Sequence, residues 1–185
     1  RQYFRGTGAH NTVRVDGEDQ SIQGGNFMWL RHAKARCLEF RSDADGGEFV
    51  GEHDGYVRLQ DPVLHRRTVR LDAAGIEIMD YLRCDGRHTI ERCWHFSEQC
   101  TVSESANAIV AEQGPVRVTL RVAEPACEIR KFRGSEEPPA GWVSRHFDVK
   151  VPADSIYFIN EIRGTSELKT LITWETGLGG AAHED

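Results

Sequence analysis

Residues 6–21 read GTGAHNTVRVDGEDQS, and the pattern inside this stretch indicates the fold class of the chain. Apolar and polar side chains alternate over residues 12–15, which is the period-two spacing of a half-buried β-strand. That strand is expected to begin at His10, behind small and glycine residues. Asp16-Gly17 predicts a tight turn at its other end. The stretch therefore predicts a strand that begins at a histidine and ends in a polar turn.

The same alternation recurs along the chain and predicts an all-β protein. Residues 116–122 carry valine or leucine at every second position, which is the clearest strand pattern in the sequence. No window shows sustained helical periodicity. Ten or more short strands predict an antiparallel two-layer β-sandwich, with a cupin-like barrel as the alternative architecture. The main further strands are expected at 33–41, 63–71, 76–81, 88–96, 102–112, 126–132, 142–151, 155–163 and 167–174.

Three finer expectations follow from these patterns. Residues 63–96 should form a three-stranded antiparallel meander, because two turn sequences separate three strand patterns. Residues 27–30 should return the chain to the core, and Cys37 and Phe40 should be buried. The four tryptophans should lie in the core, although one at the rim would offer a platform for a sugar ring.

Length and composition limit the classes of function. The chain has 185 residues, with 23 basic and 29 acidic residues and a formal net charge of −6, so we expect no nucleic-acid partner. No apolar run is long enough for a transmembrane helix, so we expect no membrane partner. We expect one domain over residues 1–176 and a flexible tail over residues 177–185. Because the sequence begins with neither a methionine nor an apolar leader, we expect a piece of a longer protein.

The five cysteines are an odd number, and their spacing fits neither a zinc site nor a dense disulfide framework. We expect small, buried or half-buried thiols. A bridge between Cys84 and Cys93 across a hairpin is the alternative.

His10 is the first candidate for chemistry. A histidine at a strand edge can be a metal ligand, a general base or an orienting hydrogen-bond donor, or it can satisfy neighbouring backbone groups. His10, His65 and Asp19 would supply two nitrogens and one oxygen to a zinc ion if the fold brought them together. For His88 and His95 we expect structural roles.

Arg66 and Arg67 follow His65 and should point to opposite faces of their strand. One of them can face the candidate site, where a guanidinium suits forked binding of a carboxylate or sulfate. His53 and Tyr56 lie in a polar loop, where they would act near a sugar ring or serve structure alone. No nucleotide-binding loop and no serine-hydrolase elbow occurs in the sequence.

Several segments form a wider pattern. AHNTVRVDGEDQ at residues 9–20 is followed by FMW at 27–29, HDGY at 53–56 and LHRR at 64–67. Segments within 80–96 and GWVS at 141–144 continue it. Together these segments, which span most of the chain, resemble the heparinase II/III-like family of polysaccharide lyases.

The resemblance implies a β-sandwich that follows an N-terminal α/α toroid, with the substrate cleft between the two domains. Members cleave uronic-acid polysaccharides, such as glycosaminoglycans or alginate, by β-elimination in the periplasm or outside the cell. A base removes the C5 proton of the uronate, whose carboxylate is neutralised, and the C4 oxygen leaves. The toroid supplies a tyrosine with an asparagine or histidine, and the sandwich supplies a histidine. This chain alone should then be nearly inactive.

The resemblance also assigns roles to residues. His10 matches the sandwich histidine, either as the catalytic group or as a metal ligand. Several members hold a metal in the sandwich, which implies a structural zinc or calcium ion on His10, Asp19 and His65 and no organic cofactor. Contacts with the anionic polysaccharide are expected from Asn11, His53, Tyr56, Arg66 and Arg67.

Two other classes of function stay open on the sequence. A non-catalytic carbohydrate-binding or structural β-sandwich would support a catalytic neighbour. A cupin-like enzyme would hold a metal through His10 and His65 inside a closed barrel.

Overall fold

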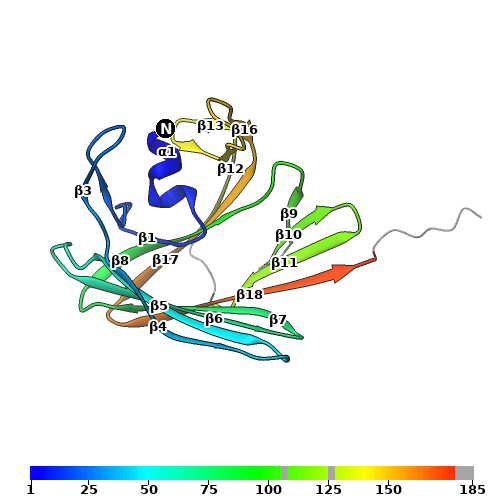
Figure 1. The fold of residues 1–185 in the computed structure, drawn as a ribbon, viewed down its shortest axis with the longest axis horizontal. Helices are drawn as coiled ribbons and strands as arrows, with labels where there is room; N and C mark the ends of the chain where they lie inside the picture. Colours follow the sequence, from blue (N-terminus) through cyan, green and yellow to red (C-terminus); the bar gives the residue numbers. More distant parts are fainter. Residues whose placement is uncertain (106–107, 125–127, 178–185) are drawn as a thin grey trace, which may run out of the picture.

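The computed structural model describes residues 1–105, 108–124 and 128–177, in which two antiparallel sheets pack face to face (Figure 1). Neither sheet closes on itself, so the predicted β-sandwich is confirmed and the cupin-like barrel is wrong. Residues 178–185 of the predicted tail, Cys127, and parts of the strands expected at 102–112 and 126–132 lie outside the described residues. Within the described ranges, no helix has the length and apolar composition needed to cross a membrane.

The larger sheet has eight strands in the order β4-β5-β6-β7-β18-β11-β10-β9. Every neighbouring pair is antiparallel, and consecutive strands are mostly joined by short turns. The strands are β4 Ala35–Ser42, β5 Gly47–Tyr56, β6 Val63–Asp72, β7 Gly75–Arg83, β9 Thr101–Ser105, β10 Ala108–Gln113, β11 Val116–Val122 and β18 Ser166–Thr176.

The smaller sheet has four strands in the order β1-β8-β17-β12. A short helix and a 3₁₀ helix precede it, and three two-stranded hairpins lie outside both sheets. The sheet strands are β1 Val13–Val15, β8 Arg87–His95, β12 Glu128–Arg133 and β17 Asp154–Arg163. The other elements are α1 Gln2–Arg5, η1 Thr7–Ala9, β2 Ile22–Gln23, β3 Trp29–Arg31, β13 Ser135–Glu136, β14 Pro139–Ala140, β15 Trp142–Val143 and β16 Val151–Pro152.

The turn predicted after β1 is present. Asp16 and Gly17 have φ angles of 52° and 71°, and both are in the left-handed region that an Asp-Gly turn between antiparallel strands requires. Val13 and Val15 are fully buried, as the alternation predicts. The strand begins at Val13 rather than at His10, because side chains and isolated contacts, not a regular ladder, hold residues 10–12.

A polar layer divides the interior into two apolar clusters. The first cluster includes Val15, Val63, Ile90 and Leu168, and the second includes Trp94, Ile109, Leu120 and Phe158. Strands that pass through both clusters carry a polar residue in between, because alternate side chains share a face. Thus β7 places Asp80 between Ile78 and Leu82. The polar layer consists of His65, Asp80, Arg92, Asn160 and Thr170, all of which are at most 5% exposed.

The predicted meander over residues 63–96 is wrong in its third strand. β6 pairs with β7, but β8 belongs to the smaller sheet, where it pairs with β1 and β17. The free edge of β7 is instead taken by β18. The Asp85-Gly86 turn therefore carries the chain from one sheet to the other.

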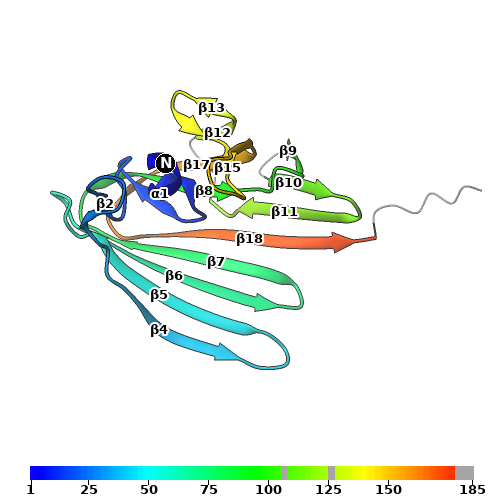
Figure 2. The same cartoon turned by 45° about the horizontal axis from the view of Figure 1, so that its top comes forward.

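Several side chains that we expected in the core are exposed. Phe27 and Leu30 are 89% and 67% exposed, because the β2–β3 hairpin projects beside α1 instead of entering the interior. Cys37 and Phe40 are exposed because β4 is the edge of the larger sheet, which extends past the smaller one (Figure 2). The expected strand 142–151 is interrupted after residue 143.

The tryptophans and cysteines also differ from expectation. Trp94 is buried and Trp174 is 46% exposed, while Trp29 and Trp142 are half-buried. Cys84 and Cys93 are free thiols, so the bridge considered between them is absent. Cys84 belongs to the core between the sheets, whereas Cys93 neighbours the inward-facing Arg92 and so points to the opposite face of β8.

Candidate functional site

His10 follows η1 directly and is exposed to solvent. Its backbone N–H donates to the Thr7 carbonyl over 3.1 Å, and its carbonyl accepts from the Thr12 N–H over 2.8 Å. The imidazole makes no hydrogen bond to any residue that the structure describes. The ring is therefore available to a ligand while its main chain is fixed.

Asp19 and Gln20 fasten η1 to the loop after β1. Asp19 Oδ1 accepts from the Thr7 N–H over 2.6 Å, and Thr7 Oγ1 accepts from the Gln20 N–H over 2.8 Å. The Gln20 side chain in turn donates to Thr12 Oγ1 over 3.0 Å. These bonds join the residues before His10 to those after it.

Residues 11–13 are held from both sheets. On the smaller sheet, the His95 N–H donates to Asn11 Oδ1 over 2.7 Å and the Cys93 N–H donates to the Thr12 carbonyl over 2.9 Å. On the larger sheet, Arg67 Nη1 donates to the Asn11 carbonyl over 2.7 Å. Tyr56 Oη donates to the Val13 carbonyl over 2.8 Å. The segment after His10 is thus a bridge between the sheets.

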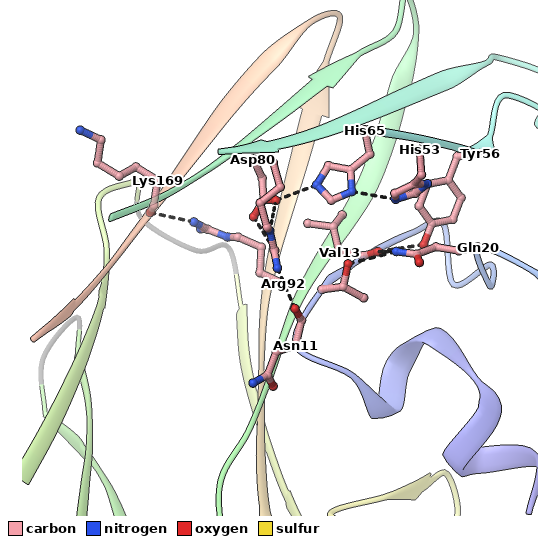
Figure 3. Close-up of polar contacts among 11 residues, drawn as sticks. Asn11, Val13, Gln20, His53, Tyr56, His65, Asp80, Arg92 and Lys169 are labelled. Atoms are coloured by element: carbon pink, nitrogen blue, oxygen red, sulfur yellow. Dashed lines mark hydrogen bonds and ion pairs between the residues drawn. The ribbon is translucent and has the colours of Figure 1, made fainter. Parts of the chain in front are cut away.

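A chain of polar contacts crosses the larger sheet behind this bridge (Figure 3). His53 Nε2 lies 3.0 Å from His65 Nδ1, and His65 Nε2 lies 2.6 Å from Asp80 Oδ1. Arg67 binds both Asp80 oxygens, over 2.7 and 2.8 Å. The cross-strand register explains the arrangement, because His53 faces His65 and Arg67 faces Asp80 on adjacent strands.

The electrostatics of these contacts favour a neutral His53 and a charged Asp80. Burial alone would raise the pKa of Asp80, but the Arg67 charge and the His65 hydrogen bond outweigh it and hold that pKa well below its usual range. Burial, with repulsion from His65 and Arg67, lowers the pKa of His53 to about 4. Near neutral pH, His53 is therefore uncharged.

Two further groups lie beside His10 on the outer face of the smaller sheet. His95 Nδ1 is 2.7 Å from Ser155 Oγ, while its Nε2 is buried and has no partner among the described residues. Burial and then the nearby His10 lower the pKa of His95 to about 4. Tyr157 Oη donates to the Gly8 carbonyl over 2.7 Å, and burial raises the pKa of this phenol.

A cavity of about 510 Å³ adjoins this group. Its lining comes mostly from α1, η1, β1 and the loop that follows β1, and includes Gly8 and Arg14. Arg58, which follows β5, and Tyr157 of β17 also line it. Arg14 is ion-paired with Glu91, and Arg58 binds Glu18 over 3.0 Å. The cavity therefore offers hydrogen-bond donors and aromatic surface close to His10, with its arginines already paired inside the protein.

The structure separates the predicted substrate contacts. Tyr56 is fully buried, so it supports Val13 and cannot touch a ligand in this arrangement. Arg66 and Arg67 do point to opposite faces: Arg66 binds Glu52 on the outer face of the larger sheet, whereas Arg67 binds Asp80 inside. Asn11 is exposed, and its side-chain oxygen is taken by His95. His53 is half-buried.

The predicted metal ligands are not brought together. Within residues 1–105, 108–124 and 128–177, no group of three histidine, cysteine, aspartate or glutamate side chains could hold a metal ion. Asp19 binds Thr7, and both ring nitrogens of His65 have partners. His10, Asp19 and His65 therefore do not fit the metal that the resemblance implies.

Sequence reasoning missed Asp80, Arg92 and the proximity of His95 to His10. Arg92 is fully buried, and its guanidinium donates to Asn160 Oδ1 over 2.9 Å and to the Lys169 carbonyl over 3.1 Å. Asp80 could have been found, because it shares the apolar face of Ile78 in the sequence pattern. A charged residue in phase with buried ones signals an internal partner.

We expect stability to fall when the pH drops from 7 to 5. Unfolded histidines bind a proton below an ordinary pKa of 6.5, whereas folded His53 and His95 bind one only near pH 4. The unfolded state then holds more protons than the folded state, which lowers the free energy of unfolding by about 2 kcal/mol per histidine at pH 5. Urea unfolding at the two pH values measures the loss, and His95→Gln should reduce it. Equal stability at pH 7 and pH 5 would contradict these assignments.

His88 acts in the opposite sense, over a different pH range. Burial lowers its pKa, but hydrogen bonds with Asp16 and Asp61 outweigh burial and raise it. The stability that His88 contributes is complete below pH 6.5 and is lost as the pH rises through the raised value. Because the unfolded pKa of 6.5 lies between the two test pH values, His88 gains some stabilisation as the pH falls and offsets a small part of the loss from His53 and His95.

Comparisons with known proteins give a consistent picture. The family model described as "Heparinase II/III-like, C-terminal" matches residues 1–175. A heparinase III gene product has a similar structure, with a TM-score of 0.76 and 16% identity over 96% of this chain and 25% of that chain. A heparan sulfate lyase from Pedobacter heparinus has a TM-score of 0.76 and 13% identity over 97% of this chain and 26% of that chain.

The chain thus spans about a quarter of the length of these solved structures. At such identities the structural likeness shows the fold alone. A search of curated protein sequences gave no match.

Proposed function

The chain belongs to the heparinase II/III-like family, as the match of its C-terminal domain model shows, and we propose that it forms the sandwich side of a polysaccharide lyase site. The substrate is an anionic, uronic-acid-containing polysaccharide, and the bond breaks by β-elimination. Heparan sulfate, the substrate in the name of one similar structure, is a polymer of this class.

The chemistry requires two things of the protein. The C5 proton of a uronate is only weakly acidic, so a base must remove it while the charge that develops at the carboxylate is stabilised. The glycosidic oxygen at C4 then leaves and needs a proton or hydrogen-bond donor. A positioned imidazole can take or supply a proton in such a step.

His10 is the residue that we assign to this role. The observation that carries the proposal is an exposed imidazole without a hydrogen-bond partner among the described residues, on a segment that is fixed from both sheets. A positioned side chain of this kind loses little freedom when substrate binds, which favours orientation in the transition state. Asn11 and the cavity beside Gly8 and Tyr157 would line the substrate path next to His10.

The remainder of the active site is proposed to come from a neighbouring domain. An N-terminal α/α toroid would supply the tyrosine and the asparagine or histidine that complete the cleft, and the 185-residue chain alone would then be nearly inactive. Because a polysaccharide does not cross a membrane unaided, we place the activity in the periplasm or outside the cell.

Analysis of the reaction products tests the proposal. The complete protein that contains this chain is incubated with a uronic-acid polymer and with the same polymer after reduction of its carboxylates. Elimination should yield products with an unsaturated uronate, detected by absorbance and by a mass one water lower than that of hydrolysis products, from the first polymer only. Saturated products from either polymer would indicate hydrolysis, and no cleavage with intact binding would indicate a carbohydrate-binding module.

A further inference from the structure

We propose that His53 and His65 form a metal-free hydrogen-bond chain that donates in one direction toward Asp80, and that Asp80, which also accepts from Arg67, thereby fixes the backbone beside His10. The chain makes Arg67 a positioning residue. The catalytic effect of Arg67 rests on the proposed function of His10. The proton arrangement of the hydrogen-bond chain and its independence of metal do not rest on that function.

The hydrogen-bond partners fix the position of the ring proton on His53 and on His65. The backbone N–H of Gly55 is 3.1 Å from His53 Nδ1, and a backbone N–H can only donate, so this nitrogen carries a lone pair. The ring proton of neutral His53 is then on Nε2 and is donated to His65 Nδ1. The proton of His65 is consequently on Nε2 and is donated to Asp80 Oδ1. The partners thus assign both tautomers.

The same hydrogen bonds leave neither histidine with a free lone pair for a metal ion. A histidine binds a metal through an unprotonated ring nitrogen. The lone pair of His53 accepts from Gly55, and the lone pair of His65 accepts from His53, so neither ring has one to spare. Arg67 also lines the cavity of about 330 Å³ onto which both histidines open, and its positive charge opposes a cation there. The hydrogen-bond chain therefore occupies the place where a metal would need ligands.

Arg67 connects the hydrogen-bond chain to the backbone next to His10. Asp80 holds the Arg67 guanidinium with two hydrogen bonds, which leaves Nη1 directed at the Asn11 carbonyl. From the other sheet, the His95 N–H holds the Asn11 side chain. Asn11 is therefore held between the two sheets at the position next to His10. Figure 3 shows Asn11 below Asp80.

The proton arrangement can be measured on the 185-residue chain by NMR of ¹⁵N-labelled histidines. We expect His53 and His65 both to be neutral with the proton on Nε2, and to stay so after one equivalent of Zn²⁺ is added. A proton on Nδ1 of either ring, or loss of an Nε2–H signal on stoichiometric Zn²⁺ binding, would overturn the chain.

Substitution of His65 separates the hydrogen-bond role from a metal role. The amide of His65→Gln can accept from His53 and donate to Asp80, but glutamine is a poor zinc ligand. We expect His65→Gln to unfold at a urea concentration close to that of the parent protein, whereas His65→Leu should unfold at a clearly lower one. Equal losses in both variants would overturn the directional chain.

Substitution of Arg67 tests the clamp on Asn11, with Arg70 as the matched control, because Arg70 lies on the opposite face of the same strand and pairs with Glu48. Lysine cannot bind both Asp80 oxygens and Asn11 together. Arg67→Lys should therefore increase the fast backbone motion of Asn11, measured by ¹⁵N relaxation, while Arg70→Lys should not. Unchanged Asn11 motion in Arg67→Lys would overturn the positioning role.

In the complete protein, the same pair of variants reports on catalysis. Arg67→Lys should lower kcat for elimination about tenfold or more with little change in KM, because a small displacement of a reacting group is costly. Arg70→Lys should leave kcat within about twofold. A parent protein without lyase activity would refute the proposed function, yet the NMR measurements would still decide whether the chain and clamp exist.

Discussion

Replacing Asp80 with alanine is expected to destabilise the domain by about 3–5 kcal/mol. The carboxylate is fully buried and accepts three hydrogen bonds, one from His65 and two from Arg67. Its removal leaves the partly buried Arg67 guanidinium without its counter-charge, and the buried His65 ring without an acceptor. Loss of one partner of a buried ion pair is among the costlier changes that a domain can undergo.

Urea unfolding of Asp80→Ala against the parent chain at neutral pH measures this loss. Asp45→Ala is the control, because Asp45 is exposed in the β4–β5 turn and its carboxylate forms no ion pair with a residue that the structure describes. The control should change stability by no more than about 0.5 kcal/mol. A loss below about 1 kcal/mol for Asp80→Ala would mean that water or another group replaces the carboxylate.

The sequence was most informative where strands follow a strict period of two. The alternation at residues 116–122 and at Val13 and Val15 corresponds to β11 and β1, because each strand has one face in the core. The Asp16-Gly17 turn could be predicted for the same local reason, since few residues accept two positive φ angles in succession.

Features that depend on which sheets pack together could not be read locally. The turn at Asp85-Gly86 has the sequence of a hairpin, but whether β8 pairs with β7 or changes sheet depends on β18, which lies about eighty residues later in the chain. The exposure of Phe40 follows from the unequal widths of the two sheets. No window around residue 40 contains that information.

The candidate site shows the same division. His10, His65 and Arg67 could be selected from the sequence, because their residue types stand out in a predicted strand context. Their relation could not, since contacts such as Arg67 with the Asn11 carbonyl join residues more than fifty positions apart. The expected metal set could not be judged from residue types alone: both His65 ring nitrogens and an Asp19 oxygen have partners inside the protein, and among the described residues no three such side chains come together to hold a metal.

Replacing His10 with alanine is expected to lower the rate of elimination by a factor of about 10²–10⁴, the usual contribution of a positioned acid–base group. Stability should hardly change, because the imidazole is exposed and has no hydrogen bond to a described residue. The combination of lost activity and retained stability distinguishes a functional histidine from a structural one such as His65.

The most direct test of the account is therefore the rate at which the complete protein forms unsaturated product from a uronic-acid polymer, measured for the parent, for His10→Ala and for His32→Ala. His32 is an exposed histidine in the β3–β4 connection and serves as the matched control. We expect at least a hundredfold loss for His10→Ala, parent-like activity for His32→Ala, and unfolding midpoints that agree among all three proteins. Activity of His10→Ala within about twofold of the parent would contradict the assignment of His10 and, with it, the central claim about this site.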